Sequence, residues 1–146
     1  AVEMKVDAEY RSCLRANHSA THLLHESLRR HLGDHVTQKG SLVDTQKLRF
    51  DFSHSRPVET ETLRIVEHEV NEQIRGNTEV VTQLMQPEDA IKAGAMALFG
   101  ENYGEDVWVV SIGISEVEEH KARYPTELCG GTHVSRMGDI GTFRLI

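Results

Sequence analysis

The segment TELCGGTH, residues 126–133, combines two side chains that favour a metal ion. Cys129 and His133 stand four positions apart with two glycines directly after the cysteine, so both side chains can turn toward one point. Thiolate and imidazole are the groups that zinc binds most readily in proteins. The segment therefore predicts half of a zinc site, and the remaining ligands must come from elsewhere in the chain.

Histidine is frequent in this sequence, with nine residues of 146, and the histidines crowd toward the N-terminal third. His18 and His22 are at i and i+4, which on a helix places them roughly 6 Å apart on one face. Together with Cys129 and His133 they would form a tetrahedral site of one cysteine and three histidines, for which zinc is preferred over harder ions. The alternative is that the two helical histidines are ordinary surface residues and that Cys129 is a small buried apolar residue.

A histidine pair on a helix is also found in zinc proteases, whose motif requires glutamate directly after the first histidine. Ser19 follows His18 in this sequence. His25 is followed by glutamate, but Arg29 occupies the position of the second histidine. The protease hypothesis therefore fails at both places.

The first two histidines lie in the segment NHSATHLLHESLRRHLG, residues 17–33, which is predicted to be a helix. Asn17 is a suitable N-cap, and Gly33 is suitable for the C-terminal end. At 100° per residue the helix has a polar and an apolar stripe side by side, with Thr21 on the border. The helix is expected to bury its leucines and to present its imidazoles beside them. His25 lies beyond the ligand pair, so replacing it with alanine should leave the metal content intact. The stripes consist of His18, His22, His25 and Arg29, and of Leu24, Leu28 and Leu32.

The other elements follow from alternation, helical spacing and turn residues. They mix helices and strands without a repeat or a linker, which indicates a single domain over residues 1–146. Its fold class is expected to be α+β, with helices and an antiparallel sheet. The zinc site is expected between a helix and a C-terminal loop. The expected elements are two strands within 40–53 around a turn at 44–46, a helix from Pro57 to Gly76, a strand in 78–85, a helix over 87–100, a strand in 106–114 and a β-leaning end at 141–146.

Composition limits the class of protein. The chain has the length of one domain, and it has no apolar run of bilayer length and no N-terminal leader. Its two cysteines are far apart in the sequence, which suits a reducing compartment. A cytoplasmic location is therefore expected. The net charge of −7 gives no general attraction to nucleic acid or to anionic lipid. A nucleic-acid partner would have to be held by a local patch, with Lys39, Lys47 and Arg56 as candidates, or by another domain.

Four motifs, NHSATHLLH, LRFDFSH, GAMALFGENYG and ELCGGTH, occur in the order and at about the spacing found in the editing domain of alanyl-tRNA synthetase. The chain resembles this family over nearly its whole length. The editing domain of threonyl-tRNA synthetase shares the two histidine-containing patterns, but LRFDFSH and ELCGGTH are similar to the alanyl type. Freestanding editing proteins are an alternative, and the abrupt beginning suggests a module cut from a longer synthetase. The segment ISEVEEHKARYP, residues 114–125, is longer than the short link in the family.

The resemblance implies a hydrolase that removes serine, with glycine as a second candidate, from the acceptor end of tRNA(Ala). Such a second check is needed because a pocket built for alanine rejects one added hydroxyl only by about a hundredfold. Serine is larger than alanine, so exclusion by size does not spare the correct product, and the editing site must recognise the hydroxyl. The implied partners are the tRNA and the rest of the synthetase. A non-catalytic zinc module that binds tRNA or protein is the remaining alternative.

The resemblance also implies roles for individual residues. The zinc ligands would be His18, His22, Cys129 and His133, in a closed structural site or in a catalytic site with one open position.

Thr21 would recognise the serine hydroxyl, although a helical threonine also bonds to the preceding turn. Gln38 would orient substrate or water, or is simply a polar residue at a strand end. The backbone N–H groups of Gly130 and Gly131 would contact the ester or the terminal ribose, or the glycines serve only the turn.

Overall fold

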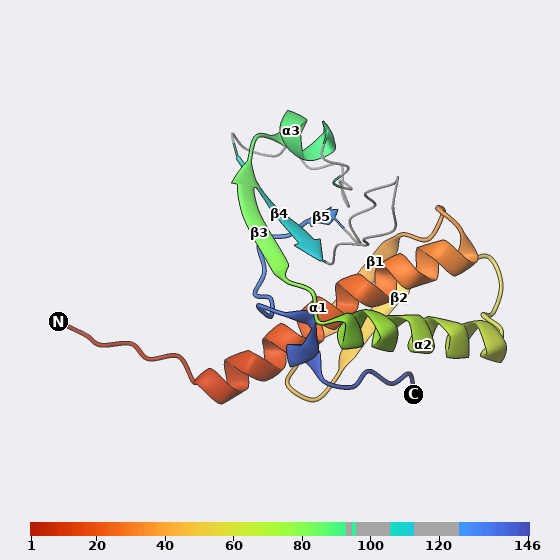
Figure 1. Ribbon diagram of the computed structural model, residues 1–146, viewed down its shortest axis with the longest axis horizontal. Helices are drawn as coiled ribbons and strands as arrows, with labels where there is room; N and C mark the ends of the chain where they lie inside the picture. The colour runs from red at the N-terminus through yellow and green to blue at the C-terminus, as the bar shows by residue number, and fades with distance from the viewer. Residues whose placement is uncertain (93–94, 96–105, 113–125) are drawn as a thin grey trace.

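The structure is a computed structural model that describes residues 1–92, 95, 106–112 and 126–146. The predicted helix over 87–100 is described only at its start, and most of GAMALFGENYG and the segment 114–125 lie outside the described residues. The described part is a mixed fold of helices and two antiparallel sheets, as expected (Figure 1). Its elements are α1 (Ala8–Leu32), β1 (Gln38–Val43), β2 (Leu48–Phe52), α2 (Thr60–Gly76), β3 (Val80–Met85), α3 (Pro87–Lys92), β4 (Val107–Ile112), β5 (Thr126–Leu128) and the 3₁₀ helix η1 (Met137–Ile140).

Helix α1 is longer than predicted, and Asn17 is not its N-cap. The helix begins at Ala8, and the side chain of Asp7 caps it by accepting the N–H of Tyr10 at 2.9 Å. No proline or glycine lies between residues 8 and 17, so nothing in this stretch stops a helix. Asn17 instead donates its side-chain N–H to the backbone carbonyl of Asp44, at 2.8 Å. The predicted end is confirmed, since Gly33 follows the last turn with a φ of 115°.

Strands β1 and β2 form the predicted hairpin. The Asp44 carboxylate accepts the N–H groups of Gln46 and Lys47, which closes the turn between the strands. The register shifts between Gln38 and Gly40, which is a β-bulge at the start of β1. The apolar side chains of β2 pack against the core, as their alternation predicts.

Helix α2 presents Val66, Val70 and Ile74 to the core at the predicted spacing. Pro57 is not in its first turn, because Glu59 is the N-cap and the helix begins at Thr60. Proline lacks a backbone N–H, which suits a connecting segment as well as the first turn of a helix. Pro57 alone therefore does not determine where the helix begins.

Strands β3, β4 and β5 form a second antiparallel sheet in that order. The predicted β3 and β4 are confirmed, whereas the short β5 was not foreseen. The expected β-structure at 141–146 is wrong. The backbone of Phe143 pairs with the side-chain amide of Asn71, and the N–H of Leu145 is accepted by Glu67, so side chains of α2 take the place of a neighbouring strand.

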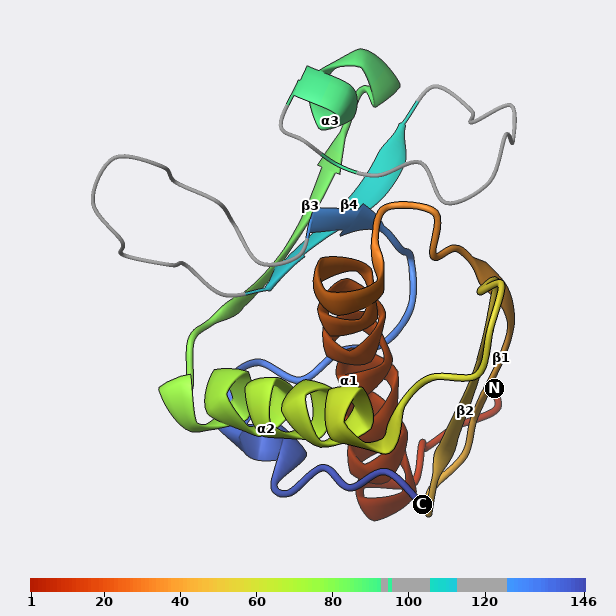
Figure 2. The same ribbon diagram turned by 90° about the vertical axis from the view of Figure 1, so that its right-hand side faces the viewer.

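Helix α1 runs through the middle of the molecule, with contacts to α2 and to the β1–β2 hairpin (Figures 1 and 2). Leu23 and Leu28 of α1 are buried with Val66 and Val70 of α2 in the main core. No helix in the described ranges is long and apolar enough to cross a membrane. The packing of α1 fixes one of its faces toward α2 and turns the histidine face toward the segment that follows β5.

Candidate metal centre

The structure brings the two predicted ligand pairs together. One nitrogen from each of three histidines and the sulfur of the cysteine all lie within 4.8 Å of one another. We refer to His18, His22, Cys129 and His133 as the four-residue cluster. Two members come from the middle of α1 and two from the loop after β5, so a separation of more than a hundred residues is closed by the fold.

The geometry of the cluster is that of rings converging on one point. His18 and His22 stack with their ring centroids 5.4 Å apart, as their i, i+4 spacing predicts. The ring of His133 lies against both, at 4.6 Å from His18 and 5.0 Å from His22. The sulfur of Cys129 is 3.5 Å from Nε2 of His18.

Backbone hydrogen bonds hold the second pair in place. Cys129 continues the β4–β5 ladder by donating its N–H to the carbonyl of Trp108, at 2.9 Å. The hydroxyl oxygen of Ser19 accepts the N–H of Val134 at 3.1 Å and lies 3.3 Å from Nδ1 of His133. The loop after β5 is thereby fastened both to the sheet and to α1.

Glu127 is a residue of the candidate site that the sequence reasoning missed. Its carboxylate is 1% exposed, and its two oxygens accept hydrogen bonds from Nδ1 of His22 and from Nδ1 of His25. The prediction that α1 buries its leucines and presents its imidazoles beside them is correct in part, because the leucines Leu24 and Leu28 are buried but His22 and His25 are buried as well. A signal was available, since Glu127 is an ionisable residue two positions before Cys129 within ELCGGTH.

Burial and hydrogen bonds shift the pKa values of the cluster residues and of Glu127. Burial raises the pKa of the Cys129 thiol, but hydrogen bonds with His133, His18 and His22 outweigh it and lower the pKa to about 3. Burial also raises the pKa of Glu127, but hydrogen bonds from His22 and His25 bring it down to about 2. Burial lowers the pKa of His22, whereas its bonds to Cys129 and Glu127 raise it to about 9. The pKa of His133 is lowered, chiefly by burial and then by repulsion from His22.

The donor atoms fit a zinc ion. Nε2 of His22 and Nε2 of His133 are buried and make no hydrogen bond of normal geometry among the described residues, although the Cys129 sulfur is near enough to shift the pKa of both rings. Both rings are engaged at Nδ1, by Glu127 and by Ser19, which leaves Nε2 of each for another group. Three imidazole nitrogens and one thiolate are a donor set that favours zinc.

Gly130 and Gly131 differ in their surroundings. A Cβ atom added to Gly131 would lie 2.0 Å from Cε1 of His18, so the backbone passes directly against this ring. A Cβ atom added to Gly130 would make an ordinary contact, 3.4 Å from the side chain of Trp108. Close approach is therefore a structural reason for the second glycine only.

Thr21 and Gln38 are positioned less directly. The hydroxyl of Thr21 is buried and donates to the carbonyl of Asn17 at 2.9 Å, which is the bond to the preceding turn that a helical threonine makes. The oxygen of Thr21 still has lone pairs to accept a further hydrogen. Gln38 is half-buried and begins β1 at the bulge, and among the described residues no hydrogen bond joins it to the four-residue cluster.

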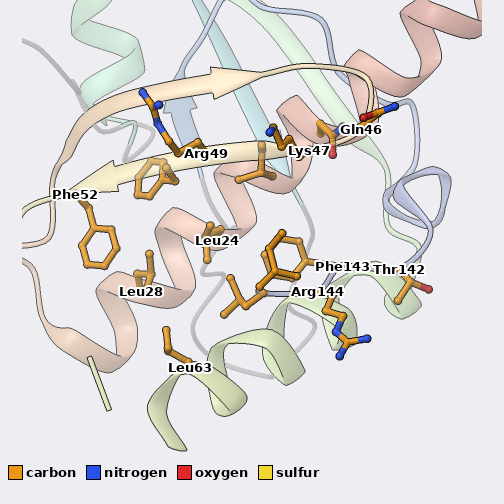
Figure 3. Close-up of a pocket in the computed structure, with 15 residues that line it drawn as sticks. Leu24, Leu28, Gln46, Lys47, Arg49, Phe52, Leu63, Thr142, Phe143 and Arg144 are labelled. Atoms are coloured by element: carbon orange, nitrogen blue, oxygen red, sulfur yellow. The ribbon is translucent and has the colours of Figure 1, made fainter. Parts of the chain in front are cut away.

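An apolar pocket of about 500 Å³ lies elsewhere, between α1, β2, α2 and the C-terminal segment (Figure 3). Leu24 and Leu28 of α1 line it together with Phe52 and Phe143. Lys47 is at its wall, and no member of the four-residue cluster lines it. The pocket is thus separate from the metal centre.

Comparison with known proteins identifies the family of this chain. Residues 107–146, which include Cys129 and His133, match the family described as the threonyl and alanyl tRNA synthetase second additional domain. The chain is also similar to alanine–tRNA ligases. It is 61% identical over 145 residues to that of Parvibaculum lavamentivorans, which is 99% of this chain and 16% of the relative.

Two further relatives give the same result. Identity to the alanine–tRNA ligase of Granulibacter bethesdensis is 60% over 144 residues, and to that of Sphingopyxis alaskensis 54% over 145 residues, in each case 99% of this chain and 16% of the relative. The chain spans 16% of the length of these relatives. Because it is more than half identical to them over almost its whole length, and because its match to the family model includes Cys129 and His133, this chain belongs to the alanyl-tRNA synthetase family.

Proposed function

We propose that this chain is an aminoacyl-tRNA deacylase that hydrolyses Ser-tRNA(Ala), and also Gly-tRNA(Ala), as proofreading after alanyl-tRNA synthesis. The observation that carries the proposal is the four-residue cluster, which converges within a domain shared with alanine–tRNA ligases. Synthesis of alanyl-tRNA needs such a step because serine differs from alanine by one hydroxyl, which a hydrophobic pocket rejects weakly. We also propose that the chain acts in the cytoplasm and that its partners are the tRNA and the rest of the synthetase.

Zinc is the proposed metal, held by Nε2 of His22 and His133, by His18 and by the sulfur of Cys129. Bound there, it would serve as a closed structural centre or, with one position open to water or substrate, as a Lewis acid at the ester bond. The residues of the chain orient this site. Glu127 and Ser19 engage the outer nitrogens of two histidines and thereby select which nitrogen faces inward.

Thr21 is the proposed reader of the serine hydroxyl. Its own hydrogen is donated to Asn17, so its oxygen is left as an acceptor, and a serine hydroxyl would donate to it. Alanine offers no such donor, so the pairing is lost with the correct amino acid. Gln38 and the N–H groups of Gly130 and Gly131 are the proposed contacts to the ester, the terminal ribose or water.

The proposal is tested by incubating the zinc-loaded chain with Ser-tRNA(Ala), Gly-tRNA(Ala), Ala-tRNA(Ala) and Ser-tRNA(Thr). Selective loss of serine from tRNA(Ala), abolished in a Cys129→Ala variant, is expected. Hydrolysis of Ser-tRNA(Thr) only would identify a threonyl-type editor instead. No hydrolysis of any of these tRNAs by folded, zinc-replete protein would point to the non-catalytic module and contradict the proposal.

A further inference from the structure

Glu127 is a carboxylate with almost no contact with water, two positions before Cys129 in the sequence. Leaving such a charge unpaired in the interior costs several kcal/mol, so it must be held by strong partners. Each of its oxygens accepts a hydrogen bond from a different imidazole, Oε1 from His25 at 2.9 Å and Oε2 from His22. The carboxylate thus bridges a cluster residue and a histidine outside the cluster.

The direction of these bonds matters for a metal ion. An ionised carboxylate only accepts, so both histidines must carry a proton at Nδ1. For His22 this leaves the buried Nε2 as the ring nitrogen that does not bond Glu127, and in the neutral ring that binds a metal the lone pair is on this atom. The ring of His25 packs against Phe50, with centroids 5.2 Å apart, so the anchor of Glu127 is itself fixed.

We propose that Glu127 is a positioning residue of the metal centre: anchored by His25 through one oxygen, it holds His22 through the other, in the tautomer and orientation that bind the ion. His25 is then an outer member of the site and not a ligand. The inference rests on zinc binding by the four-residue cluster, which is part of the proposed function, but it does not require that the domain hydrolyse any tRNA.

Charge balance supports the same role. A zinc ion and one thiolate have a net charge of +1, and one buried carboxylate brings the sum to zero. Replacing Glu127 with glutamine would leave the centre with a net positive charge beside the buried ring of His22. Glutamine would also present an N–H₂ group to one of the two imidazoles, which would force that ring to move its proton or to turn away.

Zinc affinity measures this role without reference to catalysis. We expect the Glu127→Gln variant to bind zinc about ten- to hundredfold more weakly than the wild type, in competition with a chelator of known affinity, since changes in such outer partners have effects of this size. His25→Leu, which keeps bulk but donates no hydrogen bond, should weaken binding in the same direction. His25→Asn should restore most of the affinity, because its side-chain amide can donate from the position of Nδ1.

Glu69→Gln is the matched control. Glu69 also binds α1 side chains, namely Ser27, Arg30 and His31, but it lies outside the cluster. Its replacement should leave the zinc dissociation constant within about twofold of the wild-type value. A general loss of packing on α1 would lower zinc affinity in both carboxylate variants, whereas loss of positioning lowers it only in Glu127→Gln. Equal losses in both variants would overturn the inference.

The tautomer of His22 provides a second measurement that needs no variant. In the zinc-loaded wild type, nitrogen-15 NMR of the imidazoles should show a proton on Nδ1 of His22, hydrogen-bonded and slow to exchange, and the metal on Nε2. A proton on Nε2, or a zinc-free wild type at saturating zinc, overturns the inference even if Glu127→Gln does not fold.

The two failures can be told apart. Unchanged zinc affinity in folded Glu127→Gln, with normal hydrolysis of Ser-tRNA(Ala), removes the positioning role and leaves the proposed function. Weaker zinc binding in Glu127→Gln, in a wild-type protein that binds zinc but hydrolyses no charged tRNA, supports the positioning role and removes the proposed function. The earlier expectation for His25 is also refined: its variants should still fill with zinc when the metal is in excess, and differ only in affinity.

Discussion

Thr21 is the residue on which substrate choice is proposed to depend. Its hydroxyl is buried and already donates to Asn17, so only its acceptor lone pairs are available to a substrate. The position next to His22 on α1 keeps it close to the four-residue cluster. A role in recognition therefore requires that the serine hydroxyl be the donor, which fixes the chemistry that a variant must remove.

We expect Thr21→Val to lower the preference for Ser-tRNA(Ala) over Ala-tRNA(Ala). Valine keeps the branched shape and removes the acceptor, which is worth roughly 1 to 2 kcal/mol, or about five- to thirtyfold in the ratio of kcat/KM values. Deacylation rates of both tRNAs by zinc-replete protein measure this ratio. Thr21→Ser keeps the hydroxyl and serves as the control. An unchanged ratio in Thr21→Val would mean that the hydroxyl is read elsewhere, with Gln38 next to be tested.

Gly131 provides a sharp test of how the cluster is built. A methyl group at this position would overlap the ring of His18, so Gly131→Ala should displace this histidine and lower zinc affinity by at least about tenfold. Gly130→Ala is the matched control, because its added methyl group makes only an ordinary contact with Trp108. Zinc titration of both variants is the measurement. Equal affinities would show that the loop moves freely away from α1.

At the scale of elements, the C-terminal segment is held by side chains and not by a strand. Asn71 on α2 donates to the carbonyl of Phe143 and accepts its N–H, so one amide replaces two ladder hydrogen bonds. The side chain of Phe143 is in turn buried in the main core. This arrangement explains how a β-leaning sequence stays outside any sheet.

Asn71→Ala should destabilise the domain by about 1 to 3 kcal/mol, because it leaves two partly buried backbone groups of Phe143 without partners. Chemical denaturation of the zinc-loaded variant measures this loss. Zinc stoichiometry should not change, since no contact links Asn71 to the cluster. Glu72→Ala, on the exposed face of the same helix, should have no measurable effect. If the two variants are equally stable, the tail does not contribute through this amide.

At the scale of the whole molecule, the cluster joins the helical half of the fold to the β3–β4–β5 sheet. The centre connects α1 with the loop after β5, and Cys129 itself is bonded to β4. A metal ion there would cross-link the two parts, and any ligand that binds only the folded state stabilises it. We expect about one zinc per chain by elemental analysis of untagged protein, and a lower melting temperature after chelation. Metal-free protein that is fully stable and active would contradict this expectation.

The pH dependence of the metal-free protein follows chiefly from three shifted groups of the candidate site, and the lowered pKa of His133 adds to the rise in stability below pH 6.5. Glu127 and Cys129 have folded pKa values of about 2 and about 3, below their ordinary 4.5 and 9.0, so each stabilises the fold increasingly as pH rises between its two values. His22 is shifted up from 6.5 to about 9, so its contribution is complete below pH 6.5 and is lost as pH rises toward 9.

The free energy of unfolding should therefore rise with pH from the acid range to about 6.5. Between 6.5 and 9 the gain from Cys129 and the loss from His22 oppose each other, so the curve should flatten. Urea denaturation at a series of pH values measures this profile. In Cys129→Ser the rise between pH 4.5 and 6.5 should be smaller, and the remainder comes from His133, whose pKa is lowered from 6.5. A wild-type maximum near pH 4 would show that the thiolate is not stabilised in the fold.

Much of the domain could be predicted because local chemistry determines it. The Asp44 turn, the leucine face of α1, the valine spacing of α2 and the end at Gly33 depend on neighbours within one or two turns. The cluster residues could also be named, since a ligand pair at i, i+4 and a C-x-x-x-H pair each form locally. That they bind zinc, and that Thr21 and Gln38 act on substrate, remain predictions.

Other features were decided only by tertiary structure. Asn17 is typical of an N-cap, but the helix already begins at Ala8. The side chain of Asn17 donates instead to the backbone carbonyl of Asp44, 27 positions away. Residues 141–146 have a sequence typical of a strand, but none of the strands in the described ranges pairs with them, and Asn71 and Glu67 bond their backbone instead. The position of Glu127 beside Cys129 could be noted from the sequence, but its partners could not be predicted, because the two imidazoles that stabilise its buried charge are about a hundred residues away. A buried charge is stable only beside its partners, and the fold determines where those partners lie.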